Sequence, residues 1–210
     1  DLVSELLDFR KQEQGFLKLK VEYMDIVSFT KEIYMSFYEY ALKHSVNYKF
    51  EHMEEKLNLW FDPVQLQKVI FNLLSNAFKY TKAKGSITVS IRKIKNEVEI
   101  RVEDDGVGIS KESIHKIFDR FYQVDGQSSE FTLGTGIGLA VSKGIVELHK
   151  GNIRVESEVG QGSVFIVTLL TGNEHFPKEV LSDSESNFHL IKDGVLEDLA
   201  LEELMLEEPA

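Results

Sequence analysis

The stretch DPVQLQKVIFNLLSNAFKYT, residues 62–81, predicts a long helix that carries chemistry on one face. An aspartate followed by a proline is typical of a helix N-cap and first turn. Apolar residues then recur at helical spacing and predict a buried face, made up of Val69, Ile70, Leu73, Leu74 and Ala77. A polar stripe at positions i, i+4, i+7 and i+8 of the same helix consists of Asn72, Asn76, Lys79 and Tyr80.

Two asparagines in the middle of a helix need an explanation. Asparagine is a mediocre helix former, because its side chain competes for backbone hydrogen bonds. A neutral amide oxygen is also a suitable ligand for a Mg²⁺ ion whose other ligands are phosphates and waters. The simpler interpretation, a solvated helix face, is less favoured once two glycine clusters further along the chain are considered.

These glycine clusters are DDGVGIS at 104–110 and GTGIGL at 134–139. The first closes an alternating run, 98–103, that predicts a half-buried strand, and the second opens an apolar-periodic stretch, 137–148, that predicts a helix. Glycine lets the backbone approach a ligand closely, and free N–H groups at a helix start suit phosphate. An acidic residue at a strand end, facing such a helix start, indicates a nucleotide held at both ends.

In this order the motifs resemble the ATP-binding catalytic domain of sensor histidine kinases. Residues 72–80 resemble the asparagine box of that family, and 104–108 its first glycine box. Residues 117–123 resemble the phenylalanine box, and 134–139 the second glycine box. The resemblance covers residues 1 to about 171 in the correct order, and four motifs in register are far more specific than any one of them.

The resemblance implies a role for each matching residue. Asp104 would accept a hydrogen bond from the adenine amino group, and Gly106 and Gly108 would let the chain turn beneath the ring. Asn76 would coordinate Mg²⁺, with Asn72 beside it on the phosphate side. The cofactors implied are therefore ATP and Mg²⁺.

Further roles concern the phosphates and the loop that covers them. Lys79 would meet phosphate charge and Tyr80 would line the nucleotide, while residues 119–135 would form a mobile lid. The N–H groups of Gly136 and Gly138 would hold phosphate. The predicted ATP-binding set is Asn72, Asn76, Lys79, Tyr80, Asp104, Gly106, Gly108, Arg120, Thr135, Gly136, Gly138 and Leu139, with Asn76 as the metal ligand.

One position departs from the family pattern. The family often carries an arginine where Gln123 stands, and a glutamine cannot supply charge to a γ-phosphate. Arg120, three residues earlier, is the alternative phosphate contact, and an ordinary exposed cation is the competing interpretation of that residue.

The order of helical and strand patterns predicts an α/β (α+β) two-layer sandwich, a mixed sheet packed on one side by helices, with a mobile ATP lid. A strand is expected at 18–24, and one helix capped by Asp25 with apolar positions through Ala41. The other expected strands are 47–53, 57–61, 86–94, 97–104, 151–157 and 163–170.

Three segments are expected along the chain. Residues 1–14 resemble the end of the dimerisation and phosphoacceptor hairpin, and 15–171 the catalytic domain. Residues 172–210 are expected to form a solvated acidic linker, with eleven acids and two bases from 173 onward, giving −9 of the total charge of −11. In hybrid histidine kinases such a stretch leads to a receiver domain. No histidine here is followed by the acid and later proline of the acceptor motif, so the acceptor is expected elsewhere.

Composition limits the partners and the compartment. The first 172 residues carry only −2, which argues against a nucleic-acid binder. Zero cysteines exclude disulfides and thiolate metal sites. No apolar run reaches 18 residues, so this stretch is expected not to span a membrane. The resemblance to sensor histidine kinases implies that it is the cytoplasmic portion of an inner-membrane sensor kinase. The expected partners are its own acceptor hairpin, a response regulator receiver domain and a second copy, with the full-length protein a membrane-anchored homodimer.

The function that follows is Mg²⁺-dependent ATP binding and transfer of the γ-phosphoryl group to a histidine, in two-component signal transduction. The alternatives are an ATPase of the same fold, of gyrase, mismatch-repair or chaperone type, a related serine kinase, and a non-catalytic pseudokinase. Those hydrolases and serine kinases carry a glutamate four residues before the metal-binding asparagine. Asn72 stands there instead, and an amide cannot act as a general base.

Overall fold

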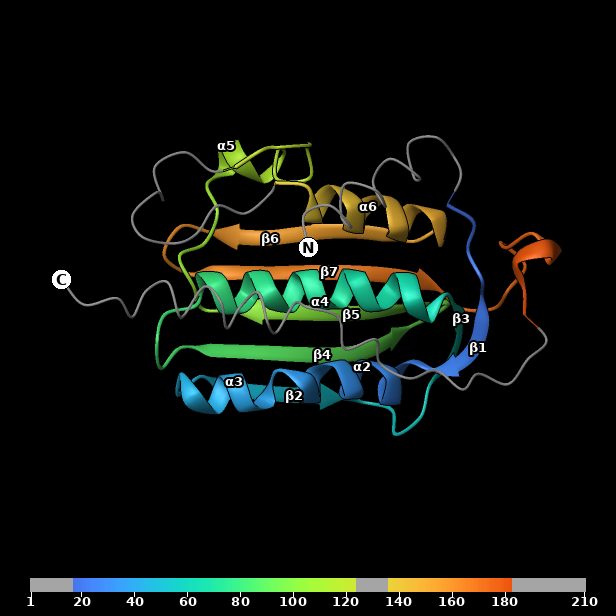
Figure 1. Ribbon diagram of the computed structural model, residues 1–210, viewed down its shortest axis with the longest axis horizontal. Coiled ribbons are helices and arrows are strands. Elements are labelled where there is room, and N and C mark those ends of the chain that lie inside the picture. Colours follow the sequence, from blue (N-terminus) through green and yellow to red (C-terminus); the bar gives the residue numbers. More distant parts are fainter. Residues whose placement is uncertain (1–16, 124–135, 183–210) are drawn as a thin grey trace.

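A five-stranded mixed sheet, covered on one face by helices, forms the body of the molecule (Figure 1). The computed structural model describes residues 17–123 and 136–182. Its strands are β1 Glu22–Asp25, β2 Asn47–His52, β3 Asn58–Phe61, β4 Ser86–Ile94, β5 Glu97–Asp104, β6 Asn152–Glu158 and β7 Gly162–Leu170. Its helices are α2 Ile26–Ser36, α3 Tyr38–Lys43, α4 Pro63–Tyr80, α5 Lys111–Ile114 and α6 Gly138–Leu148, with a 3₁₀ turn, η1, at Lys178–Val180.

The main sheet has the strand order β2-β4-β5-β7-β6, in which only the β2–β4 pair is parallel. The two predicted hairpins, β4–β5 and β6–β7, are confirmed, and so is the mixed two-layer α+β architecture. Asp104 ends β5 in the middle of this sheet, opposite Ile87 on one side and Ser163 on the other. The register therefore fixes the position of the first glycine cluster.

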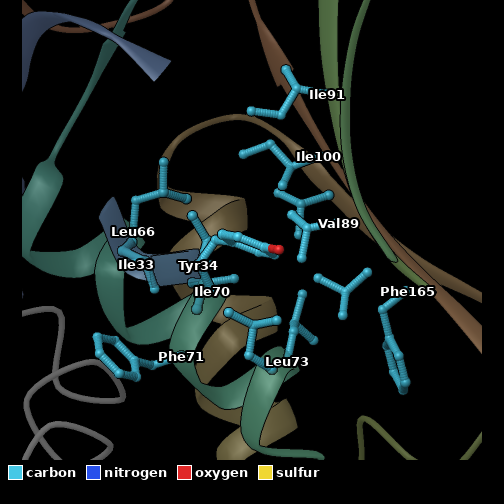
Figure 2. Close-up of a cluster of buried hydrophobic side chains, with 14 of the residues drawn as sticks. Ile33, Tyr34, Leu66, Ile70, Phe71, Leu73, Val89, Ile91, Ile100 and Phe165 are labelled. Atoms are coloured by element: carbon cyan, nitrogen blue, oxygen red, sulfur yellow. The ribbon is translucent and has the colours of Figure 1, made fainter. Parts of the chain in front are cut away.

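Helix α4 forms as the sequence predicts and supplies the centre of the core. The Asp62 side chain accepts a hydrogen bond from the Gln65 N–H at 3.0 Å, and Pro63 occupies the first turn, where its missing N–H costs nothing. Figure 2 shows the cluster in which side chains of α2 and α4 meet those of the sheet, including Ile33, Tyr34, Leu66, Ile70, Leu73, Val89, Ile100 and Phe165. Burying this face leaves the polar stripe of α4 toward the site.

The single helix expected after Asp25 is instead two helices that break at Phe37. The Ser36 hydroxyl donates to the Ile33 carbonyl at 2.6 Å, which competes with the helix ladder. Phe37 is fully buried and its ring lies against Phe71 and Phe78 of α4. The break lets the backbone turn while this aromatic contact is kept.

The first expected strand is shorter than predicted and lies outside the main sheet. β1 pairs antiparallel with β3 in a separate two-stranded sheet, from Glu22 opposite Phe61 to Asp25 opposite Asn58. The alternating pattern that continues upstream through Lys18 therefore does not extend the pairing with β3.

The segment that follows β7 also differs from the solvated linker expected there. Phe176 is buried, and the chain near Val180 is hydrogen-bonded to the segment that leads into β1. Residues 176–182 thus pack against the domain through one buried aromatic side chain and backbone hydrogen bonds. This short stretch carries one acid and one base, and most of the acids of the expected linker lie beyond it. Within 17–123 and 136–182, no helix has the length and apolar character that crossing a membrane requires.

Candidate functional site

Three motifs that lie far apart in the sequence meet around the second half of α4. The first glycine cluster packs against its last turn, where the Val107 N–H donates to the Tyr80 carbonyl at 3.3 Å. A side chain at Gly106 would collide with that same carbonyl, and one at Gly138 would collide with the Asn72 amide. The structure therefore brings together the asparagine stripe, the end of β5 and the start of α6.

Asp104 provides a buried acceptor at the end of β5. Its Oδ1 accepts a hydrogen bond from the Gly106 N–H at 2.9 Å, and only 6% of the residue is exposed. Burial raises the pKa of Asp104 to about 6, with smaller increases from the charges of Asp105 and Glu103, while the backbone N–H groups of Gly106 and Ser163 act in the opposite direction. A carboxylate held in this way can accept from a ligand amino group.

Gly108 explains why the first cluster needs a second glycine. Its φ is +69°, in the region that favours glycine. A Cβ there would also collide with the carbonyl of Glu158 at the end of β6. The turn after Asp104 can therefore close only with glycine at this position.

The four residues of the polar stripe have different surroundings. Asn72 donates from Nδ2 to the Ser142 hydroxyl of α6 at 2.9 Å. Asn76, one turn further along, is half-buried, and within the described part of the chain its amide makes no hydrogen bond. The Lys79 ammonium lies 5.8 Å from the centre of the Tyr80 ring, and Tyr80 is 43% exposed. The stripe thus offers one amide, one cation and one aromatic ring to a ligand.

The start of α6 is open to an anion. Ile137 occupies the N-cap position and supplies no side-chain cap, so the N–H groups of the first turn have no capping side chain. Such groups, together with the helix dipole, favour phosphate. Gly138 begins the helix and Leu139 packs partly against the core. Thr135, also predicted in the site, lies outside the described residues.

The phenylalanine box meets the second glycine cluster at the base of the predicted lid. The Phe121 N–H donates to the Gly136 carbonyl at 2.9 Å, and both residues have positive φ, +58° and +65°. This hydrogen bond joins the two ends of the segment 124–135, which lies outside the described residues. Arg120 and Gln123 are both exposed. The phosphate contact of Arg120 therefore stays a prediction.

Two serines at the site were not singled out by the sequence. Ser142 is 2% exposed and holds Asn72, and the backbone of Ser163 stabilises the Asp104 carboxylate. Ser142 lies 70 positions from its partner, and no local pattern in the sequence indicates such a contact. Ser163 is the second residue of β7 and pairs with Asp104 in the sheet, and the glycines at 160 and 162 are the available signal in the sequence.

The donor set fits ATP with Mg²⁺. Among the residues the structure describes, no group of three histidine, cysteine or acidic side chains could hold a metal by itself. An amide oxygen such as that of Asn76 suits an ion held mainly by phosphates and waters, which is the usual coordination of Mg²⁺ at nucleotides. The unpartnered amide of Asn76 and the uncapped start of α6 are the features that make this fit.

Comparison with known proteins agrees with this geometry. Residues 61–173 match the family model of the histidine kinase-, DNA gyrase B- and HSP90-like ATPases. Histidine kinase P4 of Formosa agariphila is 38% identical over 218 residues, covering 99% of this chain and 16% of its own length. Sensor protein SrrB of Staphylococcus aureus is 32% identical over 169 residues, covering 80% of this chain and 29% of its own length.

Solved structures give the same result. The catalytic domain of histidine kinase ThkA superposes with a TM-score of 0.65 at 27% identity, covering 73% of this chain and 99% of that domain. Full-length ShkA in complex with AMPPNP has the same fold, with a TM-score of 0.72 at 24% identity, covering 81% of this chain and 36% of ShkA. By sequence and by fold, the chain belongs to the histidine kinase-, DNA gyrase B- and HSP90-like ATPase family, and its relatives there are histidine kinase catalytic domains.

Proposed function

We propose that this chain binds Mg²⁺-ATP and presents its γ-phosphate to a histidine on a dimerisation hairpin. The base would be selected by Asp104, whose buried carboxylate accepts from the adenine amino group. The phosphates would lie between Asn76 and Lys79 on α4 and the uncapped start of α6. When bound, Mg²⁺ would neutralise phosphate charge, and the chain's own residues would position the nucleotide.

The observation that carries the proposal is that an amide, Asn72, stands where a general base would be needed to activate water. In hydrolases of this fold, as the sequence resemblance implies, a glutamate at this position takes the proton from the attacking water. Here the Asn72 amide is hydrogen-bonded to Ser142 and has no proton-accepting group. The domain therefore holds ATP without activating water, and the nucleophile must come from another segment.

The proposed partners follow from the similarity to sensor histidine kinases. We propose that the acceptor is the chain's own hairpin, that the phosphoryl group passes on to a receiver domain of a response regulator, and that the full-length protein is a membrane-anchored homodimer whose catalytic part is cytoplasmic. A solved complex of histidine kinase ThkA with response regulator TrrA, which shares the fold at 24% identity, supports that kind of partner. The share of each relative that this chain spans, 16% and 29%, leaves room for such segments.

A labelling experiment tests the proposal. The purified chain is incubated with γ-³²P-ATP and Mg²⁺, with and without a protein that supplies an acceptor hairpin. We expect slow hydrolysis, no self-labelling, and labelling of the added hairpin that is stable to base and labile to acid, as a phosphohistidine is. Rapid ATP turnover by the chain alone, abolished by Asn76→Ala, would establish the hydrolase alternative instead.

A further inference from the structure

The chain that leaves the last strand of the domain runs beside the chain that enters it. The Val21 N–H donates to the Val180 carbonyl, and the Ser182 N–H donates to the Val21 carbonyl, both at 2.8 Å. Val21 and Leu181 form a parallel bridge. We call residues 174–182 the strap and residues 17–21 the leading segment. The strap thus makes a single parallel β-bridge with the leading segment.

An apolar cluster underlies this pairing and is separate from the main core. Its buried members are Leu19 and Val21 of the leading segment and Phe176 of the strap. Partly buried side chains pack around them: Trp60, Leu148, Val180 and Leu181. The family model ends at residue 173, so the strap lies beyond the part of the chain that this model describes. The model begins at residue 61, so the leading segment lies outside it as well.

His149 connects the strap to both nucleotide-binding helices. It follows α6 directly, is 1% exposed, and lies 6.2 Å edge-on from the Phe176 ring. Its Nε2 accepts a hydrogen bond from the Asp62 N–H at 2.9 Å, and its Nδ1 lies 2.8 Å from the Ile145 carbonyl. The ring is therefore held in the tautomer that carries its proton on Nδ1.

Asp62 completes the connection to the leading segment. One carboxylate oxygen caps α4 through the Gln65 N–H, and the other accepts from the Lys20 N–H at 2.7 Å. The start of α4, the end of α6, the leading segment and the strap thus meet at one junction, formed by Lys20, Asp62, His149 and Phe176.

The same two helices carry the nucleotide site at their opposite ends. Along α4, Asp62 lies at the junction and Asn76 lies four turns later in the site. Along α6, Gly138 begins the helix at the site, and His149 ends it at the junction. The pair formed by α4 and α6 therefore runs from one region to the other, and it is the physical route by which packing at the junction would act on the site.

We propose that the strap is an intramolecular docking element that binds the leading segment and couples its position to nucleotide occupancy. The docking follows from the contacts above. The coupling rests on the ATP binding proposed in the preceding subsection, since a ligand must favour one arrangement of α4 and α6 for a shift to occur. The chain segments on both sides of the domain would then be held together more tightly in one nucleotide state than in the other.

Two matched pairs of variants test the docking. Ser182→Pro removes the N–H that donates to Val21, whereas Ser182→Ala keeps it. Phe176→Ala empties the cluster, whereas Phe176→Leu keeps most of its apolar volume. Residue-resolved hydrogen exchange should show the Val21 amide exchanging about tenfold faster in Ser182→Pro and Phe176→Ala, and little changed in the two controls, with β4 and β5 equally protected in all four. Unchanged Val21 exchange in both disruptive variants would overturn the docking.

The coupling is tested on the same amide with Mg²⁺-ATP. We expect saturating nucleotide to change the Val21 exchange rate by about threefold or more in the unmodified chain. Because coupling is reciprocal, Ser182→Pro should change ATP affinity by a similar factor and Ser182→Ala should not. ATP that binds without any change at Val21 would overturn the coupling. Absence of ATP binding would instead overturn the proposed function, while the variant results without nucleotide would still decide the docking.

Discussion

The side-chain amide of Asn72 on α4 donates a hydrogen bond to the hydroxyl of Ser142 on α6, at 2.9 Å. The contact joins α4 and α6, the two helices that we propose to hold the metal and the phosphates. Gly138 allows it, because any side chain there would collide with the Asn72 amide. Ser142 is thus a positioning residue for the site, since it acts through Asn72 and α6.

Replacing Ser142 should therefore cost stability. Ser142→Ala leaves the half-buried amide of Asn72 without its partner, which we expect to lower the free energy of unfolding by about 1 kcal/mol. Urea denaturation measures the change. Ser75→Ala, on the same helix α4 as Asn72 and with no side-chain hydrogen bond in the described part, is the matched control and should change stability little. Equal effects of the two substitutions would show that the hydrogen bond contributes nothing.

Asn76→Ala should weaken ATP binding in a metal-dependent way. Losing one ligand to Mg²⁺ is expected to lower affinity about tenfold, or about 1.4 kcal/mol, when Mg²⁺ is present, and to have a much smaller effect in EDTA. Calorimetry with both buffers makes the comparison. Asn58→Ala, an exposed asparagine on β3 away from the site, controls for loss of an amide. The same loss of affinity with and without metal would remove Asn76 from the metal site.

Asp104→Asn should weaken ATP about tenfold or more, because a charge-assisted hydrogen bond is worth about 1.5–3 kcal/mol. Since burial raises the pKa of Asp104 to about 6, the unmodified chain should also lose ATP affinity as the pH falls through about 6. ATP titrates in the same range, so the measurement is the difference between the two proteins across pH 5–8. GTP that competes as well as ATP would contradict the assignment of Asp104 to the base.

Without nucleotide, the same substitution should act on stability with the opposite sign. A carboxyl whose pKa is raised in the folded state is ionised there at a cost, so stability is highest below its unfolded pKa and falls as the pH rises through about 6. Asp104→Asn removes this cost and should be at least as stable as the unmodified chain at pH 8. A variant that is less stable at pH 8 would show that the ionised carboxylate stabilises the turn at Gly106.

His149 should make stability depend on pH below neutrality. Burial lowers the pKa of His149, with a further decrease from His175, while the Ile145 carbonyl and the Asp62 carboxylate act in the opposite direction. The unfolded chain then binds the proton more readily, so stability is complete above the unfolded pKa of about 6.5 and falls as the pH decreases below it. His149→Gln should flatten the stability curve between pH 7 and 5.

An NMR titration of the His149 ring checks this prediction independently of whether His149→Gln folds. We expect its pKa below the ordinary histidine value of about 6.5. A His149 ring that titrates at or above that value would contradict the neutral, Nδ1-protonated state, and with it the hydrogen bond from the Asp62 N–H.

Local patterns in the sequence determined most of the elements and predicted the candidate site. The cap at Asp62, the apolar face of α4 and the two hairpins could be predicted, because their causes lie within a few residues of each other. The asparagine stripe and the two glycine clusters indicated a nucleotide for the same reason: each places a particular chemical group on a short stretch of backbone.

Only the tertiary structure decided the contacts between distant segments. The break at Phe37 depends on aromatic rings of α4, and the bond between Asn72 and Ser142 joins positions 70 apart. The strap packs onto Val21 although it lies in the stretch, 172–210, that was expected to be a solvated linker. The physical reason is the same in all three cases. The stabilising free energy of the contact comes from a partner that is distant in sequence, so the residues next to it in the chain do not indicate the contact.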